Sequence, residues 1–303
     1  MCDEFTEAEN EAYLARKRLN RRDFTIAGAS VAAIAVVPGC MAKDQPKASG
    51  SGAASPGLET VSGMVTVETP DGKADAFWVH PKTGKHPAVL MWPDIAGLRP
   101  AFHTMATRLA AAGYAVLAVN QYYRSAPAPV LASFADWRTD AGQAKLRPMI
   151  AAITPDRTTS DGGAFVAWLD KQPQVDTAKK VGTVGYCMGG PFTVRTAVST
   201  PDRVGAACSM HGANLVSDDP QSPVKLLGKT RAAYLFAIGQ NDDERQPDAK
   251  TALRQAADAA HLHAEIEVYP ANHGWCVIDT PVYDHDAAER AWSRMLATYQ
   301  TYL

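Results

Sequence analysis

The sequence predicts an α/β fold, with one domain built around a mostly parallel, doubly wound sheet of about eight strands. Short apolar runs alternate with segments of helical period from Thr60 onward, as expected when helices cover both faces of such a sheet. The central runs are continuously apolar, which is typical of strands buried on both faces. One of them, Val181 to Val184, runs directly into a glycine-rich turn over residues 185–189.

The first two predicted strands form an antiparallel hairpin, because the turn signal Pro70-Asp71-Gly72 separates Met64–Glu68 from Ala76–His80. The other strands are expected where short apolar runs occur further along the chain. These runs are Ala88–Trp92, Ala115–Val119, Val181–Val184, Gly205–Met210, Ala233–Ile238 and Ala264–Tyr269.

The first predicted helix covers Pro100–Ala112, since proline suits a first helical turn. Phe102, Met105 and Leu109 share one face of this helix at helical spacing. Residues 125–160 are less regular and are expected to cover or rim the functional site. Further helices are expected at Ala164–Lys171, Gly189–Thr200, Pro247–Ala260 and Asp284–Leu303.

Composition and charge argue against several classes of protein. The chain has 303 residues and a formal net charge of −2, so a basic nucleic-acid footprint is missing and no nucleic-acid partner is expected. Its five cysteines are irregularly spaced, which indicates neither a disulfide framework nor a zinc site. The sequence holds no nucleotide motif, phosphate-binding glycine loop or metal-ligand cluster, so we expect no cofactor and no metal.

The N-terminal region differs in composition from the rest of the chain. A basic block, Arg16–Phe24, precedes an uncharged, alanine-rich run, Thr25–Val37. The block contains Asn-Arg-Arg-Asp-Phe, which resembles a twin-arginine export signal, and the apolar run is too short to span a bilayer comfortably. We therefore expect an exported, periplasmic protein that meets the export machinery through this segment. The alternative is a basic tail or a weak amphipathic helix.

Domain boundaries follow from this change in composition. We expect a signal segment over residues 1–40, a flexible linker rich in Ser, Gly, Ala and Pro over 41–59, and the folded domain over 60–303. Val37-Pro38-Gly39-Cys40 faintly resembles a lipobox, although proline before the glycine fits that pattern poorly. Acylation of Cys40 would anchor the exported protein to a membrane.

Gly185-Tyr186-Cys187-Met188-Gly189 is a G-x-C-x-G pentapeptide, the pattern of a nucleophile elbow with cysteine in place of serine. A side chain two residues from the nucleophile on either flank would collide with the backbone, and the two glycines avoid that collision. A helix is expected to start beneath Cys187, so that its N-terminal amides stabilise a thiolate. The alternative is a buried structural cysteine beside a glycine-rich turn.

Two candidate partners of the nucleophile follow it along the chain. In α/β folds with such an elbow, an acid and then a histidine come at the carboxyl ends of later strands. Asp242 and His273 each come directly after a predicted strand. We therefore predict a triad of Cys187, His273 and Asp242, in which the acid holds the histidine ring in the useful tautomer. Asp243 is the alternative acid, although the loop spacing favours Asp242.

Together these motifs resemble the dienelactone hydrolase family of α/β-hydrolases over residues 60–303. The residues that carry the resemblance are Gly185–Gly190, Asn241-Asp242, His273-Gly274-Trp275, Trp92–Pro100 and Asn120–Arg124. The resemblance implies an α/β-hydrolase fold and a carboxylic-ester or lactone hydrolase of the carboxymethylenebutenolidase type. It also implies a small-molecule ester or lactone substrate and no cofactor.

The resemblance further implies roles for residues around the nucleophile. The backbone N–H groups of Ile95 and Met188 would form the oxyanion hole. Asp94 stands where the family has an acid, usually glutamate, that pairs with the resting thiol and participates in its activation. Because the aspartate side chain is shorter than glutamate, the sequence leaves it open whether Asp94 pairs with the thiol and activates it in this way. A turn-forming or helix-capping aspartate is the alternative.

Three residues are expected to bind substrate by the same resemblance. Arg124 matches an arginine that binds a substrate carboxylate, with a solvated surface arginine as the alternative. Tyr123 precedes it in the matching segment, and His211 follows a predicted strand and would line the pocket unless it is a neutral packing histidine. The family's second arginine is replaced by Val277, which argues against dienelactone itself as the substrate.

The residue types define the expected chemistry. A thiol with a pKa near 8.5 is only about 3% thiolate at pH 7, and a helix N-terminus and His273 would raise that fraction. Thiolate attack on an ester or lactone carbonyl would give a thioester acyl-enzyme that water cleaves. An acyltransferase with the same nucleophile, or a non-catalytic exported binding protein on this scaffold, are the alternatives.

Cys208 and Cys276 are both predicted near the carboxyl ends of strands. Export would bring them into an oxidising compartment, so a disulfide between them is a further hypothesis. The sequence does not show how far apart they lie.

Overall fold

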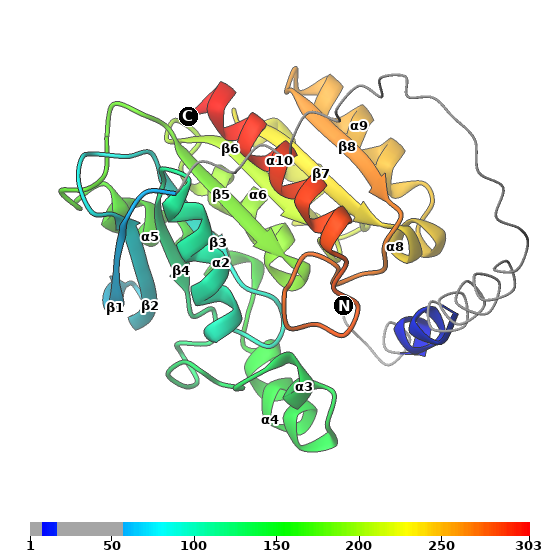
Figure 1. The fold of residues 1–303 in the computed structure, drawn as a ribbon. Coiled ribbons are helices and arrows are strands. Elements are labelled where there is room, and N and C mark those ends of the chain that lie inside the picture. Colours follow the sequence, from blue (N-terminus) through cyan, green and yellow to red (C-terminus); the bar gives the residue numbers. More distant parts are fainter. Residues whose placement is uncertain (1–7, 17–56) are drawn as a thin grey trace, which may run out of the picture.

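The computed structural model describes residues 8–16 and 57–303 (Figure 1). Apart from Arg16, the basic block and apolar run of the predicted export signal lie outside these residues, as do Cys40 and most of the predicted linker. The described chain is built around an eight-stranded sheet with the order β1-β2-β4-β3-β5-β6-β7-β8. This sheet and its flanking helices confirm the predicted α/β fold class.

The sheet is antiparallel only at one edge. β1 pairs antiparallel with β2 and β2 pairs antiparallel with β4, whereas every later pair of neighbours is parallel. The leading hairpin was therefore correctly predicted. The strands are β1 Thr60–Thr69, β2 Gly72–Pro81, β3 Ala88–Trp92, β4 Ala115–Val119, β5 Val181–Tyr186, β6 Val204–Met210, β7 Ala233–Gly239 and β8 Ala264–Tyr269.

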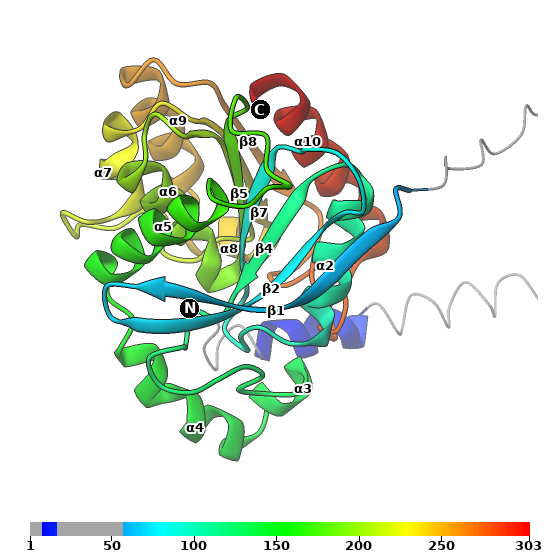
Figure 2. The same ribbon diagram turned by 90° about the vertical axis from the view of Figure 1, so that its left-hand side faces the viewer.

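Helices cover both faces of the sheet. α2 and α10 pack on one face, while α5, α6 and α9 lie on the other (Figures 1 and 2). None of the helices in the described ranges is long and apolar enough to cross a membrane. The larger helices are α2 Pro100–Ala111, α4 Asp140–Ala151, α5 Pro155–Leu169, α6 Gly190–Ser199, α9 Ala249–Ala259 and α10 His285–Tyr302. The short ones are α3 Phe134–Trp137, α7 Pro223–Leu226, α8 Gln240–Arg245 and the 3₁₀ turns Cys187–Gly189 and Leu227–Lys229.

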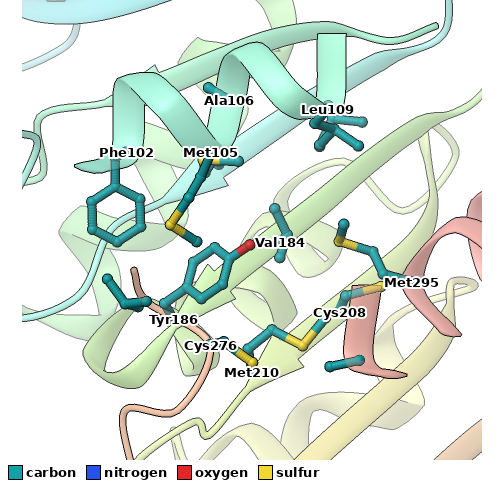
Figure 3. Packing of buried hydrophobic residues seen from close by; sticks show 14 of the residues in the cluster. Phe102, Met105, Ala106, Leu109, Val184, Tyr186, Cys208, Met210, Cys276 and Met295 are labelled. Carbon is teal, nitrogen blue, oxygen red and sulfur yellow. The ribbon is translucent and has the colours of Figure 1, made fainter. Parts of the chain in front are cut away.

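The core beneath α2 and α10 is rich in sulfur-containing side chains (Figure 3). Met105 from α2 and Met295 from α10 pack there against residues of β5 and β6. Cys208 and Cys276 lie in the same cluster, and both are buried free thiols. The structure therefore contradicts the hypothesis that these two cysteines pair.

Two regions differ from the expected secondary structure. Residues 125–160 contain the regular helix α4, whose first turn is capped by the side chain of Thr139. Helix α5 starts at Pro155, earlier than predicted, because residues 156–161 are all polar and give no apolar pattern from which a helix would be recognised. A Cβ atom on Gly162 would lie 2.8 Å from Oγ1 of Thr196 in α6, so the glycine permits close packing of the two helices.

Candidate active site

Cys187 occupies a sharp turn at the carboxyl end of β5. Its φ angle is +52°, in the left-handed region that L-residues rarely adopt. A Cβ atom on Gly185 would lie 2.0 Å from the carbonyl oxygen of Gly189, and one on Gly189 would lie 2.5 Å from the carbonyl oxygen of Trp92. These distances are the steric reason for glycine at both flanks of the turn. One 3₁₀ turn, Cys187–Gly189, precedes α6, so the α-helix begins at Gly190, one residue after its predicted start at Gly189.

His273 and Asp242 are hydrogen-bonded to each other beside the cysteine. Nδ1 of His273 lies 2.8 Å from Oδ2 of Asp242. The backbone N–H of His273 also donates to Oδ1 of Asn241 at 2.8 Å, which fixes the histidine loop against α8. Asp243 points elsewhere and forms an ion pair with Lys250. Asp242 was predicted to lie in a loop, but it belongs to the short helix α8.

The His273 ring is buried between two groups that favour its charged form. Burial alone would lower the pKa of His273, but the charges of Asp242 and Cys187 and hydrogen bonds to both raise it above the ordinary value. Because Nδ1 is engaged by Asp242, Nε2 is the ring nitrogen available to the thiol. These contacts therefore favour the imidazolium form of His273.

The side chains of Cys187 and His273 line a small cavity. His211, which has a φ angle of +40°, meets the edge of the His273 ring with their centroids 4.9 Å apart. Burial and the neighbouring His273 hold the pKa of His211 well below its usual range, so His211 is a neutral wall of the cavity. The lining residues are Asn10, Asp94, Phe134, Cys187, His211, His273, Gly274, Thr280 and Val282.

Asp94 lines this cavity and is held by Arg99. Nη1 and Nη2 of Arg99 donate to the two carboxylate oxygens of Asp94 at 2.7 and 2.9 Å. The same guanidinium donates through Nε and Nη2 to Asp279 at 2.8 and 2.7 Å. Burial raises the pKa of Asp94, and the nearby Arg99 offsets only part of this effect. A fully buried arginine thus joins two carboxylates from segments far apart in the sequence.

The predicted oxyanion residues, Ile95 and Met188, both pack in the cluster that contains Cys187. The hydroxyl of Tyr122 donates to the carbonyl oxygen of Ile95 at 2.7 Å. Nε2 of Gln121 donates to the carbonyl oxygen of Asp94 at 2.7 Å. Two residues that follow β4 therefore fix the peptide group that carries the Ile95 N–H and the peptide group that follows it.

Arg124 and Tyr123 lie away from this cavity. The guanidinium of Arg124 binds Asp161 with distances of 2.7 and 2.8 Å, and it also binds Asp71. The Tyr123 hydroxyl contacts Asp161 at 2.8 Å and Thr69 at 2.7 Å. Neither residue is among those that line the cavity, so the structure does not bring them together with the triad.

Sequence reasoning missed Arg99, Asp279 and Asn10. The sequence does single out Arg99, because it is the one cation in the otherwise apolar or acidic loop Trp92–Pro100 and could have been considered as a partner of Asp94. The sequence gives no such indication for Asn10, since it lies far upstream of the expected domain boundary. Within residues 8–16 and 57–303, no group of three or more His, Cys, Asp and Glu side chains could hold a metal ion.

Together, the mostly parallel eight-stranded sheet, the strained turn after β5 and the histidine after β8 define an α/β-hydrolase. A sequence model of the dienelactone hydrolase family matches residues 74–303. The chain belongs to this family and is a hydrolase of that type.

Individual relatives are moderately similar. A "Putative carboxymethylenebutenolidase" of Salmonella typhimurium is 27% identical over 248 residues, which cover 80% of this chain and 87% of the relative. A carboxymethylenebutenolidase of Pseudomonas sp. strain P51 is 25% identical over 237 residues, which cover 74% of this chain and 89% of the relative. The solved structure of a "Putative Dienelactone Hydrolase" from Klebsiella pneumoniae superposes with a TM-score of 0.69 at 24% identity, covering 80% of this chain and all of that one.

Proposed function

We propose that this protein hydrolyses a carboxylic ester or lactone through a cysteine thioester, with Cys187 as nucleophile, His273 as base and Asp242 as its orienting acid. The observation that carries the proposal is the partly buried hydrogen bond of 2.8 Å between His273 and Asp242, next to a cysteine on a strained elbow. Family membership and the names of the relatives support the same substrate class.

The first half-reaction forms the acyl-enzyme. The thiolate of Cys187 attacks the carbonyl carbon, and the negative charge moves to the carbonyl oxygen, which the amides of Met188 and Ile95 would stabilise. Collapse of this intermediate breaks the bond to the alkoxy group. The imidazolium of His273 gives its proton to the leaving alcohol, or to the ring-opened hydroxyl of a lactone.

The second half-reaction releases the acid. Neutral His273 takes a proton from a water molecule, whose oxygen attacks the thioester carbon. The tetrahedral intermediate collapses with the Cys187 sulfur as leaving group, which restores the thiolate–imidazolium pair. Asp242 stabilises the charged ring at the start and end of the cycle without exchanging its own proton.

Two implied roles are modified by the observed contacts. Asp94 stays the candidate acid beside the thiol, but Arg99 holds both of its oxygens, so its charge acts from a fixed position. The predicted role of Arg124 as a carboxylate ligand stays a prediction, and its ion pairs with Asp161 and Asp71 lend it no support.

The test replaces the nucleophile and a matched thiol. Cys187→Ala should abolish hydrolysis of a short aryl ester, measured by release of the phenol, while circular dichroism shows an intact fold. Cys208→Ala removes another buried free thiol, from the neighbouring strand β6, and should retain activity. Equal activity in the Cys187→Ala protein and the unmodified protein would refute the cysteine mechanism.

We further propose that the protein is exported to the periplasm by the segment around Arg21 and Arg22. The support is the sequence pattern, a paired arginine block followed by a short uncharged run. Substituting lysine for both arginines should retain the protein in the cytoplasmic fraction of producing cells. The same distribution with and without the substitutions would contradict twin-arginine export.

A further inference from the structure

The N-terminal helix, residues 8–16, contributes Asn10 to the wall of the cavity that Cys187 and His273 line. Figures 1 and 2 show it at the same end of the molecule as α3 and α4. We propose that this helix is a plug: it docks on the loops that carry His273 and Asp242 and restricts access to Cys187. The proposal rests on the proposed function, since it concerns the same nucleophile.

The helix binds the two residues that directly precede the candidate catalytic acid and base. Nδ2 of Asn272 donates to Oδ1 of Asn10 at 3.1 Å. Nδ2 of Asn241 donates to a carboxylate oxygen of Glu9 at 2.8 Å. The plug is therefore seated on the catalytic loops themselves, and its removal would expose both of them.

Asn10 reaches into the cavity. Its side chain is buried, with the residue only 4% exposed, and Nδ2 donates to the carbonyl oxygen of His273 at 3.4 Å. With Asn10 as part of its wall, the cavity has an accessible volume of only about 10 Å³. A single water molecule needs roughly 10–15 Å³ of such volume, so with the helix docked the cavity has no room for a substrate.

Charge complementarity explains why this segment fits this surface. Glu9 pairs with Arg245 at 3.0 Å, and Glu11 pairs with Arg138 at 2.9 Å. These pairs are partly or largely exposed, and exposed pairs contribute only about 0–1 kcal/mol each. Such contacts fix where the helix docks and leave it able to detach.

The position of the plug in the chain links it to export. Residues 8–16 come before the paired arginines, so one N-terminal segment contains both the plug and the proposed export signal. Cleavage that removes the signal would remove the plug with it. Access to Cys187 would then be restricted in the uncleaved chain and unrestricted in the processed protein.

The experiment uses the full chain with Glu9→Ala and Asn10→Ala combined. Alanine is the best helix former, so these substitutions remove the docking contacts while helix formation stays favourable. The matched control is Ala15→Ser, at an exposed position of the same helix. The rate of Cys187 alkylation at neutral pH is followed by peptide mass spectrometry with two reagents, small iodoacetamide and bulkier N-ethylmaleimide.

A plug predicts faster alkylation in the double variant by about tenfold, which corresponds to about 1.4 kcal/mol, with the larger gain for N-ethylmaleimide. A change equal for both reagents would mean altered thiol reactivity and would overturn the plug. Rates equal to those of the unmodified protein would overturn it as well. Faster alkylation without ester turnover in either protein would support the plug and contradict the hydrolase proposal, so the two failures are distinguishable.

Discussion

Asp242 and Asp243 are adjacent residues of the same chemical type, and their surroundings separate their roles. Asp242 faces the His273 ring at 2.8 Å, whereas Asp243 faces the ammonium group of Lys250. Both lie in α8, where one step along the helix turns a side chain by about 100°. The direction set by the helix therefore decides which carboxylate can orient the histidine.

Asp242→Asn should lower hydrolysis by about three to four orders of magnitude, because a neutral amide neither fixes the tautomer nor stabilises the imidazolium. Asp242 raises the pKa of His273, so the variant should have a lower pKa there and lose the imidazolium at lower pH. Iodoacetamide alkylation of Cys187 should then fall most at pH values above the lowered pKa of His273 and below the ordinary thiol pKa of about 8.5. Asp243→Asn is the control, and an equal loss in it would contradict the assignment.

At the scale of elements, the turn between β5 and α6 is the most constrained segment of the site. Cys187 has a positive φ angle, and its two flanking glycines approach backbone atoms of the turn and of β3. The spacing of the motif is therefore imposed by backbone contacts, which cannot move as the end of a flexible side chain can.

Gly185→Ala should destabilise the fold by about 3 kcal/mol or more, since its new methyl group would lie 2.0 Å from a carbonyl oxygen. Gly63→Ala in β1 is the matched control, because nothing lies within 4 Å of the added atom. We expect Gly63→Ala to change the free energy of unfolding by no more than about 0.5 kcal/mol. Urea unfolding measures both, and similar midpoints for the two variants would refute the steric argument.

At the scale of the whole molecule, Arg99 connects three segments around the cavity. It binds Asp94 after β3 and Asp279 after β8. Asp279 in turn accepts a hydrogen bond from the backbone N–H of Phe134, at the start of α3. The arginine is fully buried, so the two carboxylates depend on it for neutralisation.

Arg99→Met should therefore destabilise the protein by about 3–5 kcal/mol, the usual cost of leaving a buried charge without its partner. Arg108→Met is the matched control, because the Arg108–Glu289 pair is largely exposed and should contribute about 1 kcal/mol or less. Chemical denaturation gives both free energies of unfolding. An equal loss of unfolding free energy in the two variants would show that burial does not determine how much the Arg99 contacts stabilise the protein.

Much of the fold was predictable because continuous apolar runs and turn signals are local in the sequence. β3, β4 and β8 match the predicted ranges residue for residue. The predicted start of α5 was too late because the first turns of this helix, residues 155–161, are almost entirely polar and carry no apolar helical pattern. The ion pairs of Arg124 were not predictable either, because its partners Asp71 and Asp161 are distant from it in the sequence.

The sequence by itself determined the fold class, the strained elbow around Cys187 and the order of the three candidate catalytic residues. These features depend on backbone sterics and on the period of apolar residues, which neighbouring residues encode. Only the tertiary structure decided that Arg99 holds Asp94 and that Asn10 lines the cavity. Both contacts join segments far apart in the chain, and which charged or polar groups meet depends on how the sheet brings its loops together.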